Sequence, residues 1–393
     1  MFRRLLRAFL WLLLFAVELA LCLAVFIGAT AFLAARRLDR DAHEVRVTAS
    51  AQHPQLNFAC QMETDALQSL FSEPDVIRDL RQLNAGITLS LIDLSPGRAQ
   101  VVRQLNSAGI PVTAWLALPG QQGYYLNASN AADAEVRFTE FQKWTADSQL
   151  RWSGIGLDIE PNLQEFTSIG RAASAALKRL FDPHTVARAR IAYGAFIARI
   201  EAAGYRVETY QFPFIADERE ARSTLLERLF GIVDVRGDRE ILMLYSSFNR
   251  SADSALIWQY GPSAQLIAVG VTAGDPQPDA RLGPLSWEEL SHDMIVASHF
   301  SPVVGIYNLE GSVHRGFLQR LTVLDWNQPA TISADQNRQV IRFRARVQAA
   351  LWTLSRLHYF AIVLLVADAW FLLRRRQRIA GHRSTHFGDS VQG

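Results

Sequence analysis

The chain has 393 residues, of which 49% are hydrophobic and 20% charged, a composition typical of a folded protein that excludes a disordered one. Residues 1–40 carry six arginines and two acids, and residues 374–393 carry five arginines and one acid. The whole chain has a net charge of only +2, so the residues between these two ends are acidic overall. Because duplex binding needs a basic face, we expect no nucleic-acid partner. Two cysteines, Cys22 and Cys60, exclude a disulfide framework and a cysteine metal site.

The first element is an apolar stretch over residues 8–34 that only Glu18 interrupts. It is long enough to cross ~30 Å of hydrocarbon, and longer than the ~7 to 15 apolar residues in the core of a secretory signal peptide. Ala29-Thr30-Ala31 resembles a cleavage motif, so a cleaved signal peptide remains the alternative. We expect residues 1–44 to form a cytoplasmic amino terminus and an uncleaved transmembrane helix.

Short β-branched or apolar runs then alternate with amphipathic stretches, which is typical of parallel strands joined by helices. The pattern predicts eight strands, at 56–62, 87–94, 111–118, 153–160, 205–212, 240–247, 266–271 and 303–309. It predicts helices between them, among others at 73–83, 134–150, 186–204 and 286–300. Eight such units indicate an α/β protein with a (β/α)8 TIM barrel, which we expect over residues 45–335. An open doubly wound sheet is the alternative, but no glycine-rich phosphate-binding sequence follows the first strand.

The fourth predicted strand ends in two acids, Asp158 and Glu160, whose alternating positions place them on one face. Reacting groups of barrel enzymes stand at the carboxyl ends of strands, and two acids in a barrel mouth are costly to bury unless they are paired or functional. Carboxyls that lie close together raise one another's pKa, so we predict Glu160 as a general acid with Asp158 beside it. The alternative is that they cap the next helix or bind a structural arginine.

Other side chains near the same rim are candidates for binding a sugar, because aromatic rings can lie against its apolar faces. The aromatic candidates are Trp115, Tyr124, Tyr125, Tyr210, Phe212, Tyr245 and Phe248. We assign Trp115, Tyr124 and Tyr210 to substrate binding, although barrel cores also use aromatic residues for packing alone. Glu310, just beyond the eighth strand, is assigned to substrate binding. If the reaction needs a second catalytic carboxylate, Glu310 is the best candidate for it, ahead of Asp275, Glu208 and Glu63.

The histidines predict no metal centre. His382 and His386 have a helical ligand spacing but fall in a polar tail, and no other pair among the nine histidines has a zinc-type spacing. We therefore expect neither a metal nor a cofactor.

Residues 152–160, WSGIGLDIE, resemble the strand-four motif D-G-x-D-x-D-x-E of the family 18 glycoside hydrolases, the chitinase-like enzymes. Gly154, Asp158 and Glu160 match the motif, whereas Ser153 and Gly156 stand where that family has Asp. The resemblance lies at the level of the superfamily, because the strand-three S-x-G-G motif is not recognisable.

Two further segments resemble that family. Residues 243–246, MLYS, are similar to its strand-six M-x-Y-D with Ser246 in place of Asp, and residues 305–310 are similar to a strand-eight segment that usually has Trp where Leu309 stands. The resemblance implies a retaining reaction in which Glu160 protonates the glycosidic oxygen and the N-acetyl oxygen of the substrate attacks the anomeric carbon. Asp158 would orient the acetamido group and Tyr245 would donate a hydrogen bond to it. Gly156 removes an acid with which Asp158 could share a proton, so turnover could be slow or absent.

The last element is a second apolar stretch, residues 357–373, followed by Arg374, Arg375, Arg376 and Arg378. Such a cluster is typical of the cytoplasmic side. We expect residues 336–393 to form a second transmembrane helix with a basic cytoplasmic tail. Both termini then lie inside, and the barrel faces the periplasm or the cell exterior from a plasma (inner) membrane.

The sequence thus predicts a membrane-anchored glycoside hydrolase that acts on an extracytoplasmic polysaccharide, one with N-acetylhexosamine if the resemblance holds. Its partners would be the glycan and the lipid bilayer, and the arginine-rich composition suits a bacterium with GC-rich codons. The alternative is a noncatalytic glycan-binding or scaffolding barrel, which Ser153, Gly156 and Ser246 favour.

Overall fold

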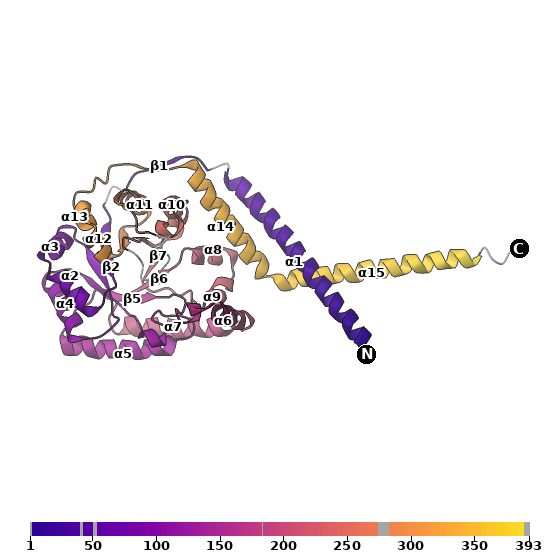
Figure 1. The fold of residues 1–393 in the computed structure, drawn as a ribbon, viewed down its shortest axis with the longest axis horizontal. Coiled ribbons are helices and arrows are strands. Elements are labelled where there is room, and N and C mark those ends of the chain that lie inside the picture. Colours follow the sequence, from indigo (N-terminus) through magenta and orange to yellow (C-terminus); the bar gives the residue numbers. More distant parts are fainter. Residues whose placement is uncertain (1, 40–41, 50–52, 183, 274–282, 389–393) are drawn as a thin grey trace.

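Eight parallel strands close into a barrel in the structure, a computed structural model that describes residues 2–39, 42–49, 53–182, 184–273 and 283–388 (Figure 1). The strands are β2 (Gln55–Cys60), β3 (Gly86–Ser90), β4 (Val112–Trp115), β5 (Gly154–Asp158), β6 (Val207–Gln211), β7 (Arg239–Met243), β8 (Leu266–Gly270) and β9 (Val303–Tyr307). Each is hydrogen-bonded to its neighbours in chain order, and β9 closes the ring on β2. The predicted barrel and all eight of its strands are confirmed.

Helices surround the barrel and connect its strands (Figure 1). They are α2 (Thr64–Ser72), α3 (Pro74–Gln82), α4 (Pro96–Ser107), α5 (Ala131–Ser148), α6 (Ile169–Phe181), α7 (His184–Ala202), α8 (Phe214–Ala221), α9 (Leu225–Phe230), α10 (Ala255–Tyr260), α11 (Trp287–Phe300), α12 (Leu309–His314) and α13 (Phe317–Leu321). Local sequence sets several of their starts, as in α11, where Ser286 and Glu289 form a reciprocal capping box. Between helices and strands lies the main core, to which β5 contributes Ile155 and Leu157, both fully buried.

The inside of the barrel is lined differently from its outside. Barrel interiors are usually filled by Val, Ile and Leu, whereas many inward positions here hold small or polar residues, such as Asn57, Thr88, Thr113, Gly156 and Ala268. Small side chains leave space along the axis, and this space is the cavity described below.

The segments that flank the barrel pair with each other. Strand β1 (Val45–Val47) runs antiparallel to β10 (Ala330–Ile332), so the chain enters and leaves the barrel at the same place. Helix α14 (Ala334–Leu354) packs between the barrel helix α8 and the amino-terminal helix α1 (Phe2–Asp39). Helix α15 (Leu357–Gly388) follows, and the rings of Phe26 in α1 and Phe360 in α15 lie 5.0 Å apart.

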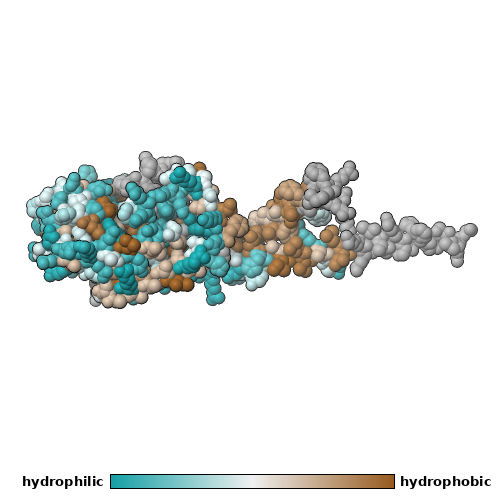
Figure 2. Space-filling model, turned by 90° about the horizontal axis from the view of Figure 1, so that it is seen from below, coloured by the Kyte–Doolittle hydropathy of each residue, from teal (hydrophilic) through white to brown (hydrophobic). Residues whose placement is uncertain are grey.

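Two segments of the described chain are long and apolar enough to cross a membrane. They are Phe9–Arg37 in α1, with a mean hydropathy of 2.7, and Leu357–Arg374 in α15, with a mean hydropathy of 1.6. Their large side chains, Trp11 and Val363 among them, are exposed, and Figure 2 shows a hydrophobic surface where these helices leave the barrel. Both predicted apolar segments are therefore helices of suitable length and composition.

Candidate functional site

A cavity of about 560 Å³ lies inside the barrel and receives side chains from all eight strands. Its lining includes Ser153 and Arg206, which precede their strands, and Asp158 and Tyr245, which stand at the opposite end. The cavity therefore follows the barrel axis. Its volume lies in the range of about 300 to 1,000 Å³ that is usual for small-molecule sites.

Both predicted acids line this cavity. Asp158 is the last residue of β5, and the chain continues in an extended form, with Ile159 bridged to Leu126 and the backbone N–H of Glu160 donating to the Leu126 carbonyl at 3.0 Å. Alternation therefore turns Asp158 and Glu160 inward, while Ile159 is fully buried in the outer core. The two acids therefore face one cavity, as their alternating positions in the sequence predict.

Asp158 is a buried carboxyl in the wall of the cavity. Its side chain is 5% exposed, and its Oδ1 atom has no hydrogen-bond partner among the described residues. Burial penalises the charged form and raises the pKa of Asp158 to about 8. Unsatisfied buried polar atoms are rare in native proteins, so an acid of this kind facing a cavity marks a place where a polar ligand can bind.

Aromatic side chains form much of the wall around the two acids. The aromatic lining residues are Trp115, Tyr125, Tyr210, Phe212, Tyr245, Phe248 and Tyr307. The ring of Tyr245 lies 5.8 Å from that of Tyr307 and 5.7 Å from that of Phe248. Burial, followed by the negative charges of nearby groups that include Asp158 and Glu160, raises the pKa of Tyr245, so its hydroxyl stays protonated and able to donate.

Two of the predicted substrate-binding residues are not among the described residues that line the cavity. The Tyr124 hydroxyl instead accepts a hydrogen bond from Nε2 of Gln61 at 2.5 Å, while its neighbour Tyr125 lines the cavity. Glu310 lies behind the end of β2, where it accepts a weak hydrogen bond from the Gln61 backbone N–H at 3.4 Å and contacts Cys60. Burial raises the pKa of Glu310 to about 6. Asp275, the further acid considered above, lies outside the described residues.

Tyr307 also lines the cavity, although it was not among the candidates from the sequence. Its hydroxyl donates to Oε1 of Gln61 at 2.6 Å, and Gln61 in turn contacts Tyr124. Gln61 therefore joins Tyr307 to the displaced Tyr124 at the end of the barrel. Strand alternation could have placed Tyr307 inside, since Gly305 two residues earlier also lines the cavity.

Three solved structures are similar to part of this chain at low sequence identity. The glycoside hydrolase domain of PgaB (BpsB) from Bordetella bronchiseptica is 11% identical with a TM-score of 0.41, and the match covers 70% of this chain and 99% of that one. A putative alpha-L-fucosidase from Bacteroides thetaiotaomicron is 8% identical with a TM-score of 0.39, over 71% and 96% of the two chains. The 3-keto-D-glucoside 4-epimerase YcjR from E. coli is 12% identical with a TM-score of 0.39, over 69% and 99%.

No protein-family model and no curated protein matches the sequence. At identities of 8 to 12% and TM-scores below 0.5 these similarities carry no argument, so the function has to be argued from the site. The resemblance to family 18 accordingly stays a hypothesis that rests on residues 152–160, 243–246 and 305–310.

Two of the three positions at which this chain lacks the acids of that family, 156 and 246, are occupied in specific ways. Gly156 lies beneath the ring of Tyr210, which also reaches the Thr88 hydroxyl at 3.1 Å. The Ser246 hydroxyl donates to Asp293 of α11 at 2.5 Å, outside the cavity lining. Neither position 156 nor position 246 therefore supplies an acid that could share a proton with Asp158.

A group of metal-ligand side chains lies outside the barrel, between α10 and α11. Ligand atoms of Asp253, His292 and Asp293 lie within 4.8 Å of one another. The side chains already bond to neighbours, because the Ser254 hydroxyl contacts His292 Nδ1 at 2.6 Å and donates to Asp293 at 2.5 Å, while the Thr331 N–H donates to His292 Nε2 at 2.9 Å. The group therefore has an evident structural role in joining the end of β7, α11 and β10.

Proposed function

We propose that this protein is a membrane-anchored glycoside hydrolase that acts on an extracytoplasmic polysaccharide. The observation that carries the proposal is the position of Asp158 and Glu160, which both line one aromatic-walled cavity at the carboxyl ends of the barrel strands. Within the described part of the chain, the buried Oδ1 atom of Asp158 has no hydrogen-bond partner, and a sugar hydroxyl or amide could supply one. The aromatic wall suits the apolar faces of sugar rings.

In the proposed reaction, Glu160 protonates the glycosidic oxygen as the bond to the anomeric carbon breaks. The acetamido oxygen of an N-acetylhexosamine unit attacks that carbon, so the second carboxylate that most glycosidases use as nucleophile is not needed. Asp158 orients the acetamido group, and at neutral pH its raised pKa leaves it protonated before the substrate binds. The Tyr245 hydroxyl donates a hydrogen bond to the same group.

The proposed location follows from the two apolar helices and the arginines that flank them. Residues 374–378 contain four arginines directly after the apolar part of α15, an arrangement typical of the cytoplasmic side. With both termini in the cytoplasm, the barrel faces the periplasm or the cell exterior. There it can reach a polysaccharide that a cytoplasmic enzyme cannot.

Activity assays on the full chain in lipid nanodiscs test this proposal. Wild type, Glu160→Gln and Glu63→Gln are incubated with end-labelled oligosaccharides, some containing N-acetylhexosamine and some not. Glu63 is a matched control because it is an exposed glutamate near the end of β2 that does not line the cavity. We expect wild type and Glu63→Gln to cleave an N-acetylhexosamine oligosaccharide, and Glu160→Gln to bind it without cleavage. Loss of cleavage in both variants alike would contradict the role of Glu160.

A noncatalytic glycan-binding barrel is the second candidate, and the ring of Tyr210 over Gly156 favours it. That ring takes the place of an acid that would share a proton with Asp158 in the resembling enzymes. This candidate predicts that wild type and Glu160→Gln bind an oligosaccharide with equal affinity and that neither cleaves it. If neither protein binds or cleaves any oligosaccharide, both candidates are wrong.

A further inference from the structure

Helix α6 exposes a continuous apolar stripe. Ile169, Ala173, Leu177 and Phe181 follow one another at intervals of four residues, which places them along one face of the helix. Ile169 is 91% exposed, Leu177 is 56% exposed and Phe181 is 82% exposed. None of the side chains of this helix is fully buried. Contiguous exposed apolar patches mark interaction surfaces, whereas single exposed apolar residues are ordinary.

The stripe lies beside positive charge. Helix α6 contains Arg171, Lys178 and Arg179 and no acidic residue. Arg171 and Lys178 are exposed and are seven residues apart, so they share a face next to that of Phe181. A helix with an apolar stripe and flanking cations has the pattern of helices that lie in a membrane interface, where the cations reach the headgroups.

Helix α6 is held firmly against α9 by reciprocal arginine contacts. Arg179 donates through Nε to the Arg228 carbonyl at 2.9 Å, and Arg228 donates through Nη1 to the Leu180 carbonyl at 3.1 Å. An ion pair of 2.7 Å between Arg179 and Glu165 fixes the guanidinium further. The apolar stripe is therefore presented on a helix whose opposite side is anchored.

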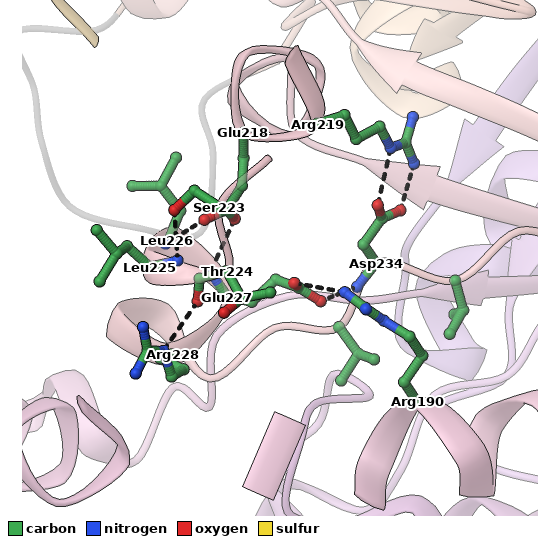
Figure 3. A network of polar contacts seen from close by, with 12 residues as sticks. Arg190, Glu218, Arg219, Ser223, Thr224, Leu225, Leu226, Glu227, Arg228 and Asp234 are labelled. Carbon is green, nitrogen blue, oxygen red and sulfur yellow. Dashed lines mark hydrogen bonds and ion pairs between the residues drawn. The ribbon is translucent and has the colours of Figure 1, made fainter. Parts of the chain in front are cut away.

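Helix α9 is fixed in turn by buried carboxylates, as Figure 3 shows. The Glu218 carboxylate accepts from the backbone N–H groups of Leu226 at 2.7 Å and Glu227 at 3.1 Å, which caps the start of α9. Glu227 accepts from Arg190 at 2.6 Å and from the Asp234 N–H at 2.6 Å. These contacts join α9 to α8, α7 and the segment that leads into β7.

This row of helices stands next to the point where α15 begins. Arg356, the residue before α15, donates to the carbonyl of Ala221, the last residue of α8, at 3.3 Å. Only residues 222–224 separate α8 from α9, to which α6 is attached. Figure 1 shows α6 and α9 on the side of the barrel from which α15 extends. If α15 enters a bilayer at Leu357, α6 lies close to the surface of that bilayer.

We propose that α6 lies in the interface of an anionic lipid bilayer, with Ile169, Leu177 and Phe181 among the acyl chains and Arg171 and Lys178 at the headgroups. The inference rests on the membrane anchoring proposed above. Each apolar side chain transferred from water favours this position, and the cations add attraction for anionic headgroups. The contact fixes how the barrel is oriented on the membrane instead of leaving it to rotate about its anchors.

An environment-sensitive fluorophore tests the position of α6 in the full chain. Leu177→Cys is labelled with a nitrobenzoxadiazole dye in a Cys22→Ser background, since the remaining Cys60 is fully buried. Val323→Cys is the matched control, because Val323 is equally apolar, is exposed and follows α13 on the far side of the barrel from α15 (Figure 1). Each protein is reconstituted in phosphatidylcholine vesicles with or without phosphatidylglycerol, and flotation verifies its insertion.

We expect the dye at residue 177, but not at 323, to show a blue-shifted emission and quenching by lipids that carry a spin label. With Arg171 and Lys178 in place, the blue shift of the dye emission at residue 177 should be larger with phosphatidylglycerol than without it. The Arg171→Glu, Lys178→Glu double variant should lose this difference. An aqueous dye at 177 in protein that floats with the vesicles would overturn this inference and leave the proposed anchoring intact. Protein that does not float would overturn both.

The dye at residue 177 could also show a blue-shifted emission in detergent, without lipid, that depends on protein concentration. This result would show that a second copy of the chain covers the apolar stripe of α6, and it would also overturn the inference. Hydrogen exchange of the unlabelled wild type provides a measurement that needs no substitution. Backbone amides of α6 should exchange more slowly in anionic vesicles than in detergent, whereas those of α13 should not change. None of these measurements depends on a glycan, so their outcome is independent of the hydrolase assay.

Discussion

The ring of Tyr210 occupies the space into which a side chain at Gly156 would extend. A Cβ atom added to Gly156 would lie 3.0 Å from Cε2 of Tyr210 and 3.6 Å from the Trp115 Cα. The Tyr210 hydroxyl is held in place between the Thr88 hydroxyl at 3.1 Å and the Glu208 carboxylate at 3.3 Å. The absence of an acid at position 156 is therefore matched by a large residue on the neighbouring strand β6.

This relationship predicts that Gly156→Asp destabilises the protein instead of restoring a family 18 motif. The added side chain must displace the Tyr210 ring, and overpacking of this kind costs about 1 to 3 kcal/mol. Chemical unfolding in detergent measures the loss. In a Tyr210→Ala background the same substitution should cost less, because the ring is gone. Equal costs in the two backgrounds would contradict direct competition between the two side chains.

The buried carboxyl of Asp158 predicts a pH-dependent stability. Its pKa is about 8 in the folded protein and 3.8 in a model compound, so the folded state keeps a proton that the unfolded state has lost between these values. Stability from this group is therefore complete below about pH 4 and is lost as pH rises toward 8, by about 1.4 kcal/mol per pH unit. Asp158→Asn removes this dependence and keeps the shape of the side chain.

Unfolding of wild type and Asp158→Asn at pH 5, 7 and 9 measures this effect. The stability of the variant relative to wild type should rise from pH 5 to pH 7 and level off above about pH 8. Asp293 and Glu310 also have raised pKa values, of about 7 and about 6, but both proteins share them, so they cancel in the difference. A difference that stays constant with pH would show that Asp158 is ionised in the folded state.

The sequence was sufficient to predict the barrel and the inward position of both acids. Strand periodicity placed all eight strands, and alternation within residues 153–160 placed Asp158 and Glu160 on the cavity side. Each of these predictions depends on backbone geometry that repeats every two residues. Such regularity holds only as long as the chain stays extended.

The sequence is less informative about side-chain direction where the chain leaves the extended form. Tyr124 has a φ of 64°, a left-handed conformation that turns its side chain away from the cavity and leaves Tyr125 to line it. Glu310 lies in the first turn of α12, which Asn308 caps, so strand alternation no longer determines its direction. Asp253, which precedes α10, meets His292 and Asp293 of α11, and spacing along the sequence does not report a contact between separate elements.

Substitution of Phe248, at the edge of the cavity, should affect ligand binding more than folding. Its side chain lines the cavity and is 46% exposed, so truncation removes little of the core. If a sugar packs against this ring, Phe248→Ala should weaken binding by about 0.5 to 1.5 kcal/mol, roughly 2- to 12-fold. Titration of the inactive Glu160→Gln protein with an oligosaccharide measures the change. Val323→Ala is the control for loss of an exposed apolar side chain, and an effect of the same size there would contradict a specific contact.

The attachment of α14 to the barrel depends on a buried ion pair. Asp217 of α8 is fully buried and accepts hydrogen bonds from Arg344 at 2.8 Å, from Gln348 at 2.8 Å and from the Tyr260 hydroxyl. Arg344→Ala leaves this carboxylate without its cation, which typically costs about 3 to 5 kcal/mol. Arg338→Ala removes an exposed ion pair with Asp335 on the same helix and should cost about 0 to 1 kcal/mol. Chemical unfolding measures both values, and adding Asp217→Asn to Arg344→Ala should recover part of the loss. Similar small losses in the two single variants would show that α14 is held to the barrel by its apolar contacts instead.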